Sequence, residues 1–138
     1  TKKDLERLGA KFKSSLEIIL GKKDEMEEYF KRILLEKYEE LLGEKGKDDP
    51  RFLSEVAALL VKYSINEECS RLIVHLKEYD KLLESNEGVG KKLDFLCQEM
   101  NREINTTASK SQMVEINLEV VKMKDALEDI REQARNIE

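Results

Sequence analysis

Residues that interrupt helices are scarce in this chain and gather in a few places. Pro50 is the single proline among 138 residues, and four of the six glycines fall in two short stretches, residues 43–46 and 88–90. Because glycine and proline are the strongest local interruptions of regular structure, these stretches are typical of connections between long elements. With 40% apolar and 40% charged residues, the sequence predicts one all-α domain over residues 1–138.

Apolar residues recur at three- and four-residue steps along most of the chain, as in amphipathic helices. This periodicity predicts one long helix over residues 2–42, with Gly21 as a place where it could bend, and a second helix over residues 50–62. Asp49 is placed to cap the second helix, and Pro50 suits a first helical turn. A third helix is predicted to begin at Asn66 as its cap and to end in residues 85–90.

Residues 113–137 hold the most regular apolar pattern. Its members follow alternating steps of three and four residues: Met113, Ile116, Val120, Met123, Leu127, Ile130, Ala134 and Ile137. Such a heptad seam predicts a coiled-coil-like C-terminal helix that packs in the same chain or against a second copy. We favour packing against the long first helix, which gives an antiparallel helical bundle.

Residues 90–110 combine a helical apolar stripe with an unusual polar content. At 100° per residue, five residues share one buried face: Leu93, Leu96, Cys97, Met100 and Ile104. Asp94, Asn101 and Asn105 are predicted to line one flank. Glu99 and Glu103 lie toward the other flank, and Phe95 and Arg102 point nearly away from the core. The polar faces of this helix are therefore the first place to seek function.

Several functional classes lack support in the sequence. The chain has no HExxH or GxSxG motif, and its single histidine gives little support to a triad hydrolase. Residues 88–92 lack the spacing of a phosphate loop, and the two cysteines lack zinc-site spacing, so we expect a helix connection and buried, reduced thiols. No apolar run approaches the ~20 residues of a membrane span. We expect a cytoplasmic protein without a membrane partner.

The formal net charge of −5 argues against a protein that coats nucleic acid through bulk positive charge. Residues 88–110 differ from the rest, since four cations and three anions give +1 there and leave −6 elsewhere. Within this segment, Lys91, Lys92, Arg102 and Lys110 could hold phosphates. Asn101, Asn105, Thr106 and Ser109 could supply neutral donors and acceptors to sugars or bases.

Carboxylates supply the second set of candidates. Glu68, Arg71 and His75 lie on one helical face, which is either a structural row of ion pairs or a carboxylate and imidazole beside a phosphate-binding guanidinium. Glu67 can also reach Arg71 at i+4. Glu99 and Glu103 lie one turn apart and with Asp94 form either a solvated face or a site for a hard divalent cation such as Mg²⁺ or Mn²⁺.

Three segments together resemble a known family. Residues 63–76 (YSINEECSRLIVHL), residues 90–110 (GKKLDFLCQEMNREINTTASK) and residues 130–138 (IREQARNIE) are similar to the carboxy-terminal half of the bacterial YicC-like family. The similarity extends over essentially all 138 residues, with departures such as Ser64, where an acidic residue is common. The resemblance implies that this chain is the C-terminal portion of a longer, homo-oligomeric, metal-dependent endoribonuclease that acts on single-stranded or small regulatory RNA.

Carried onto this chain, the resemblance implies a divalent metal, Mn²⁺ or Mg²⁺, and a set of site residues. The expected catalytic residues are Glu68, His75, Glu99 and Glu103; the expected RNA ligands are Arg71, Lys91, Lys92, Arg102, Asn105 and Lys110; the expected metal ligands are Glu68, Asp94, Glu99 and Glu103. Two other functions stay open: an RNA-binding or adaptor module that does not cut, and a structural oligomerisation domain built on the seam of residues 113–137.

Overall fold

The computed structural model describes residues 1–85 and 88–137, with all their side chains except those at positions 45, 47 and 137. Its elements are α1 (Lys2–Leu42), a 3-10 turn η1 (Glu44–Asp48), α2 (Pro50–Lys62), α3 (Asn66–Glu84), α4 (Val89–Lys110) and α5 (Val114–Ile137). The described residues contain no strand, which confirms the predicted all-α class. The helices predicted over residues 2–42 and 50–62 have these bounds, and α1 continues as one helix through Gly21.

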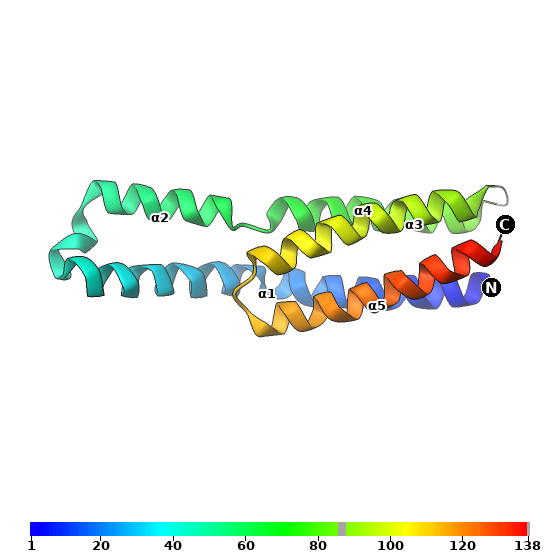
Figure 1. Ribbon diagram of the computed structural model, residues 1–138, viewed down its shortest axis with the longest axis horizontal. Helices are drawn as coiled ribbons and strands as arrows, with labels where there is room; N and C mark the ends of the chain where they lie inside the picture. The colour runs from blue at the N-terminus through cyan, green and yellow to red at the C-terminus, as the bar shows by residue number, and fades with distance from the viewer. Residues whose placement is uncertain (86–87, 138) are drawn as a thin grey trace.

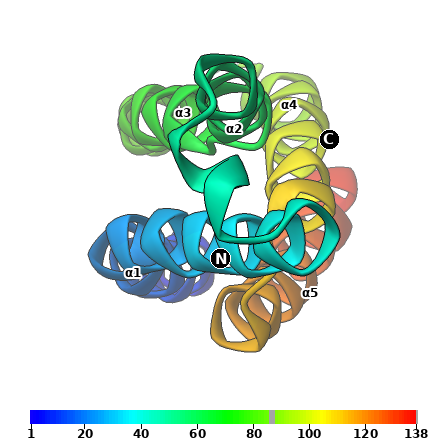
Figure 2. The same ribbon diagram turned by 90° about the vertical axis from the view of Figure 1, so that its left-hand side faces the viewer.

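Four helices form an antiparallel bundle, and the fifth lies outside it. The first half of α1 packs on α3 and α5, and α4 also packs on α3 and α5, so the four helices enclose one core (Figures 1 and 2). The second half of α1 continues beyond the bundle, where α2 folds back along it. This arrangement leaves α3 and α4 side by side along one edge of the bundle.

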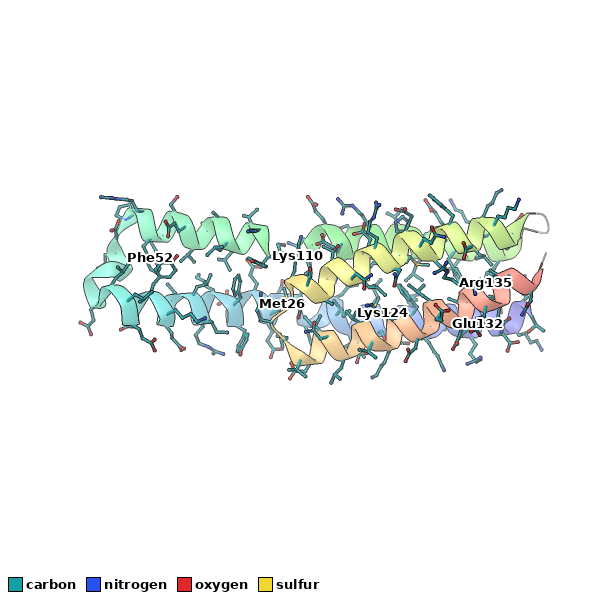
Figure 3. The ribbon with its side chains drawn as sticks, viewed as in Figure 1. Met26, Phe52, Lys110, Lys124, Glu132 and Arg135 are labelled. Carbon is teal, nitrogen blue, oxygen red and sulfur yellow. The ribbon has the colours of Figure 1, made fainter. Side chains whose placement is uncertain are left out.

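The arm formed by α2 and the second half of α1 has a small aromatic core of its own. The Phe52 ring is buried and lies 4.4 Å from the Tyr38 ring, centroid to centroid, and Phe30 contacts Tyr63 edge to face at 5.4 Å. Figure 3 shows Phe52 inside this arm and Met26 where the arm leaves the bundle. Aromatic pairs of this kind hold the two helices together where the main core has ended.

The bundle core confirms the predicted buried face of residues 90–110. All five of its residues are buried, namely Leu93, Leu96, Cys97, Met100 and Ile104. Cys69 and Cys97 are free and buried, and burial raises the pKa of these thiols to about 11 and about 12. Since protonated, desolvated thiols are inert packing groups, both cysteines serve the core.

The heptad seam of α5 packs against other helices of the same chain. Its residues from Met113 to Ala134 are buried against the core, and α5 packs on both α1 and α4. Met113 lies just before the helix begins, and the side chain of Ile137 lies outside the described residues. Intramolecular packing of the seam is therefore confirmed, while homo-oligomerisation stays a prediction.

The two predicted helix caps have different outcomes. Asp49 caps α2 as predicted, since its side chain accepts the Arg51 N–H at 2.9 Å and Pro50 opens the helix. The prediction for Asn66 was wrong: it is the first residue of α3, and Ile65 occupies the cap position. The Asn66 N–H donates to Ser64 Oγ at 3.3 Å, and the Asn66 side chain accepts from Lys23 Nζ at 2.9 Å. A tertiary contact with α1 therefore occupies the oxygen that would have capped the helix.

Among the described residues, no helix combines the length and apolar character needed to cross a bilayer.

Candidate functional site

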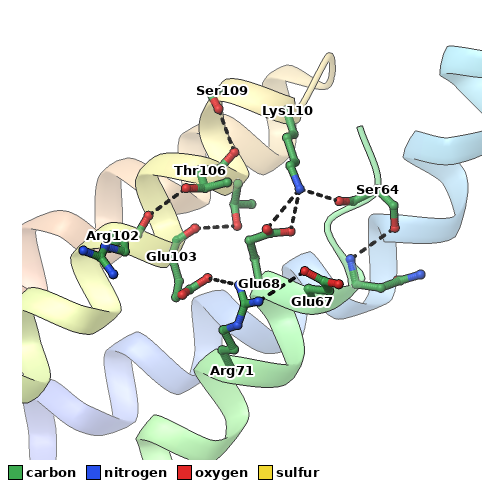
Figure 4. Close-up of polar contacts among 11 residues, drawn as sticks. Ser64, Glu67, Glu68, Arg71, Arg102, Glu103, Thr106, Ser109 and Lys110 are labelled. Atoms are coloured by element: carbon green, nitrogen blue, oxygen red, sulfur yellow. Dashed lines mark hydrogen bonds and ion pairs between the residues drawn. The ribbon is translucent and has the colours of Figure 1, made fainter. Parts of the chain in front are cut away.

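Polar side chains from α3 and α4 meet where the beginning of α3 lies beside the end of α4. We call this the α3–α4 polar cluster, and its members are Glu67, Glu68, Arg71, Glu103 and Lys110 (Figure 4). The two helices run antiparallel, so residues more than 30 positions apart in sequence come together there. Four of the five are predicted from the sequence as RNA ligands or catalytic residues, two in residues 63–76 and two in residues 90–110, and the structure joins the two segments.

Glu68 and Lys110 form the inner ion pair of the cluster. Lys110 Nζ donates to both carboxylate oxygens of Glu68, at 3.0 and 3.2 Å, and to the Ser64 carbonyl at 3.1 Å. The Glu68 side chain is only 4% exposed. The negative charge of this buried carboxylate is thus balanced by the positive charge of Lys110. This pair therefore fixes the end of α4 to the start of α3.

Arg71 forms the outer part of the cluster. Its guanidinium donates to Glu103 at 3.3 Å and to Glu67 at 3.2 Å, so the predicted contact with Glu67 is confirmed. The hydrogen bond to Glu103 raises the pKa of Arg71 above its ordinary value. Arg71 is 52% exposed and, of its five N–H donors, two are engaged with these carboxylates. The remaining donors are available to an anion from solvent.

Glu103 lies deeper than the helical wheel indicated. The sequence places it on a polar flank, whereas its side chain is only 8% exposed in the structure. Because α3 packs over this flank and supplies Arg71, the carboxylate is covered and paired at the same time. Glu103 therefore serves to hold and orient the guanidinium.

The hydroxyl groups at the end of α4 donate to their own helix. Thr106, Thr107 and Ser109 donate to the carbonyls of Arg102, Glu103 and Thr106 at 2.9 to 3.1 Å. These protons are therefore not directed outward. Asn105 and Arg102 are exposed beside them, as the sequence predicts for ligands of an external group.

The other two predicted catalytic residues, His75 and Glu99, contact residues outside the cluster. His75 is partly buried on α3, with Nδ1 3.7 Å from Glu78, and this nitrogen has no hydrogen-bond partner among the described residues. The Glu99 carboxylate lies 3.9 Å from the Arg102 guanidinium on α4. His75 shares a face of α3 with Arg71, as the spacing predicts, but its ion contact is with Glu78, and its catalytic role stays a prediction.

The four predicted metal ligands do not converge on one point. Glu68, Asp94, Glu99 and Glu103 face different cations, respectively Lys110, Arg131, Arg102 and Arg71. Within residues 1–85 and 88–137, no group of three Asp, Glu, His or Cys side chains could hold a metal ion. These residues do not fit a metal site built by one chain, and the divalent ion stays a prediction for the active protein.

Asp94 ties α4 to α5 instead. Its carboxylate accepts from Arg131 Nε at 2.9 Å and from Gln98 at 3.0 Å, and the bond from Arg131 lowers the pKa of Asp94 below its ordinary value. Sequence reasoning missed Arg131 as a partner, although it belongs to the terminal motif that was singled out. The two residues are 37 positions apart in sequence, so no local pattern indicates the contact.

The contribution of the Asp94–Arg131 pair to the free energy of unfolding should depend on pH. Since the native pKa of Asp94 is lowered, its contribution is complete above the unfolded-state pKa of ~4 and is lost as pH falls through the native value. We expect Asp94→Asn to lower the free energy of unfolding by under ~1 kcal/mol at pH 7 and by less near pH 3. Urea unfolding at the two pH values measures this; the control is Asp24→Asn, on an exposed face of α1. If Asp94→Asn lowered the free energy of unfolding more near pH 3 than at pH 7, the assignment of the ion pair would be contradicted.

The sequence matches the family described as "Endoribonuclease YicC-like, C-terminal" over residues 19–138. The chain belongs to the YicC-like family. The predicted resemblance is thereby confirmed. Among the relatives of this YicC-like chain, a protein of Haemophilus influenzae named "Probable endoribonuclease YicC" is 39% identical over 105 residues, which is 76% of this chain and 36% of that protein.

A second relative, from Clostridioides difficile, carries the same name. It is 45% identical over 91 residues, or 66% of this YicC-like chain and 31% of the relative. The chain thus spans about a third of the length of these relatives.

Proposed function

We propose that this YicC-like chain binds single-stranded RNA along α3 and α4 and contributes this surface to endoribonucleolytic cleavage. The observation that carries the proposal is Arg71, a half-exposed guanidinium oriented by Glu67 and Glu103 in a chain that belongs to an endoribonuclease family. A planar guanidinium with unused donors suits the oxygens of a phosphodiester. RNA is the substrate class that the names of the relatives support.

The cluster divides into a support and a contact surface. Glu68, Lys110 and Glu103 are largely covered, so they position the two helices and the Arg71 side chain. Arg71, Arg102 and Asn105 are exposed and would contact RNA directly. Glu99 lies one helical turn from Glu103 and is partly exposed. Among the predicted catalytic carboxylates it is therefore the one that bound RNA could reach.

The predicted metal dependence is a separate part of the proposal. A divalent cation would neutralise charge that develops on a cleaved phosphodiester. The four candidate carboxylates are held by four different cations of this chain, which does not favour a metal bound by these four residues alone. Comparing cleavage in Mg²⁺ or Mn²⁺ with cleavage in chelator tests this part directly.

One observation favours a second candidate function, a non-catalytic RNA-binding module. Glu68 and Glu103 are both covered and each is paired with a cation, which suits positioning better than proton transfer. In that case the cleaving groups would lie outside these helices. RNA binding by this chain without product formation would favour this function.

Replacement of Arg71 by lysine tests the RNA contact while it keeps the positive charge beside Glu103. We expect Arg71→Lys to weaken the binding of a labelled single-stranded RNA about threefold to tenfold, because lysine lacks the planar fork that holds two phosphate oxygens. Fluorescence anisotropy at several salt concentrations measures the effect. The control is Arg7→Lys, an exposed arginine on α1. Equal affinities for the wild type and Arg71→Lys would remove Arg71 from the interface.

A further inference from the structure

A second surface lies at the other end of the α3–α4 edge, where α3 ends and α4 begins. It is an open groove of about 490 Å³ whose apolar residues are Leu82, Phe95 and Leu96. Phe95 is 64% exposed, although it is the largest apolar side chain in the groove. Because the Phe95 ring is so exposed, it contributes little to the stability of the core, and a role in binding is the better explanation for it.

The polar residues of the groove are mainly cations. Lys81 comes from the end of α3, and Lys91 and Lys92 come from the first turn of α4. Among the residues that the structure describes, Glu78 is the one acid of the lining. Among the described residues, none of these lysines forms an ion pair. Three lysines and one glutamate give a formal charge of +2 here, in a chain that carries −5.

We propose that this groove binds a segment of single-stranded RNA, with a base stacked on Phe95 and the neighbouring phosphates held by Lys81, Lys91 and Lys92. The inference rests on the proposed function and names a further contact for the same substrate. Grooves that combine an exposed aromatic face with cations along the backbone path are the recurrent solution for binding single strands. The interfaces of proteins with other proteins are, by contrast, depleted in lysine.

The groove and the polar cluster lie along one continuous edge. On α3, Leu82, Glu78, His75 and Arg71 recur at steps of four, three and four residues, so they share a face. On α4, Phe95 and Glu103 are eight residues apart, which at ~1.5 Å per residue is about 12 Å along the helix. A single RNA strand that follows this edge would meet Phe95 first and Arg71 next.

Substitutions at Phe95 separate stacking from simple apolar contact. The affinity of this chain for a labelled single-stranded RNA is measured for the wild type, Phe95→Tyr and Phe95→Leu, with circular dichroism as the check on folding. We expect Phe95→Leu to weaken binding about tenfold and Phe95→Tyr to stay within about twofold, because tyrosine keeps the stacking face. Leu118→Ala, at an exposed position of α5, is the matched control and should bind like the wild type.

The lysines are tested by the salt dependence of binding. Changing Lys81, Lys91 and Lys92 together to glutamine should lower the slope of log affinity against log salt by about 2, since each phosphate contact on a single strand contributes ~0.7. An unchanged slope would overturn the assignment of the three lysines.

The outcomes distinguish this inference from the proposed function. If the wild type binds RNA and Phe95→Leu binds equally well, the groove assignment fails and the proposed function stands. If the wild type binds no RNA, both fail. If Phe95→Leu reduces the mass of an oligomer in light scattering while the RNA affinity stays the same, the groove is a protein contact and the inference is overturned.

Discussion

Replacing Lys110 with methionine is expected to lower the free energy of unfolding by about 3 kcal/mol. Methionine fills about the same volume as the methylene chain of lysine, but it lacks the cation that contacts both oxygens of Glu68. Because the Glu68 carboxylate is almost fully covered, an unpaired charge would remain in the bundle, and breaking a buried pair from one side costs ~3–5 kcal/mol. Urea unfolding followed by circular dichroism measures the change.

Two further variants show whether the pair is the cause. Glu68→Leu combined with Lys110→Met should recover most of the loss, because no buried charge is left without a partner. Arg102→Met removes the cation of an exposed pair with Glu99 and should cost under ~1 kcal/mol. If Lys110→Met is no more destabilising than Arg102→Met, the inner ion pair does not fix α4 to α3 as described.

Adding one methyl group at Gly9 is expected to destabilise the protein by about 2 kcal/mol. Gly9 lies inside α1 and faces the ring of Tyr79 on α3, where a Cβ atom would overlap the ring carbons. The ring cannot easily move, since Tyr79 is buried and its hydroxyl donates to the Leu5 carbonyl. The overlap is expected to cost ~3 kcal/mol, whereas the higher helix propensity of alanine contributes only ~1 kcal/mol of stability, so the net effect is destabilising.

Gly21 provides the matched control in the same helix. A Cβ atom there meets nothing within 4 Å, so Gly21→Ala should stabilise the protein by up to ~1 kcal/mol. In a Tyr79→Leu background the cost of Gly9→Ala should largely disappear, because the opposing ring is gone. A Gly9→Ala variant as stable as Gly21→Ala would show that α1 and α3 do not pack as closely as the structure indicates.

The fold was largely predictable because its helices carry their own periodic signals. The buried face of α4 and the seam of α5 follow from residue spacing alone, and the cap at Asp49 follows from the adjacent proline. The start of α3 was not predictable in the same way. Asn66 has the chemistry of a cap, and only the tertiary contact from Lys23 turns its side chain to another role.

The candidate site was predictable in its residues but not in their pairing. Sequence spacing shows which side chains share a face of one helix, and it correctly joined Glu67 to Arg71. The contacts of Lys110 with Glu68 and of Arg71 with Glu103 join different helices over 42 and 32 positions. Because α3 covers one flank of α4, these contacts also decide which carboxylates are buried, and no helical wheel contains that information.

The proposed role of Arg71 in RNA cleavage is tested by the rate at which labelled single-stranded RNA is cleaved by a protein of the relatives' full length that contains this chain. The wild type and Arg71→Lys are compared, each with Mg²⁺, with Mn²⁺ and with chelator. We expect the wild type to cleave the RNA and Arg71→Lys to lower kcat/KM about threefold to tenfold. Cleavage that is unchanged by Arg71→Lys, or no cleavage by the wild type under any of these conditions, would contradict the proposed role.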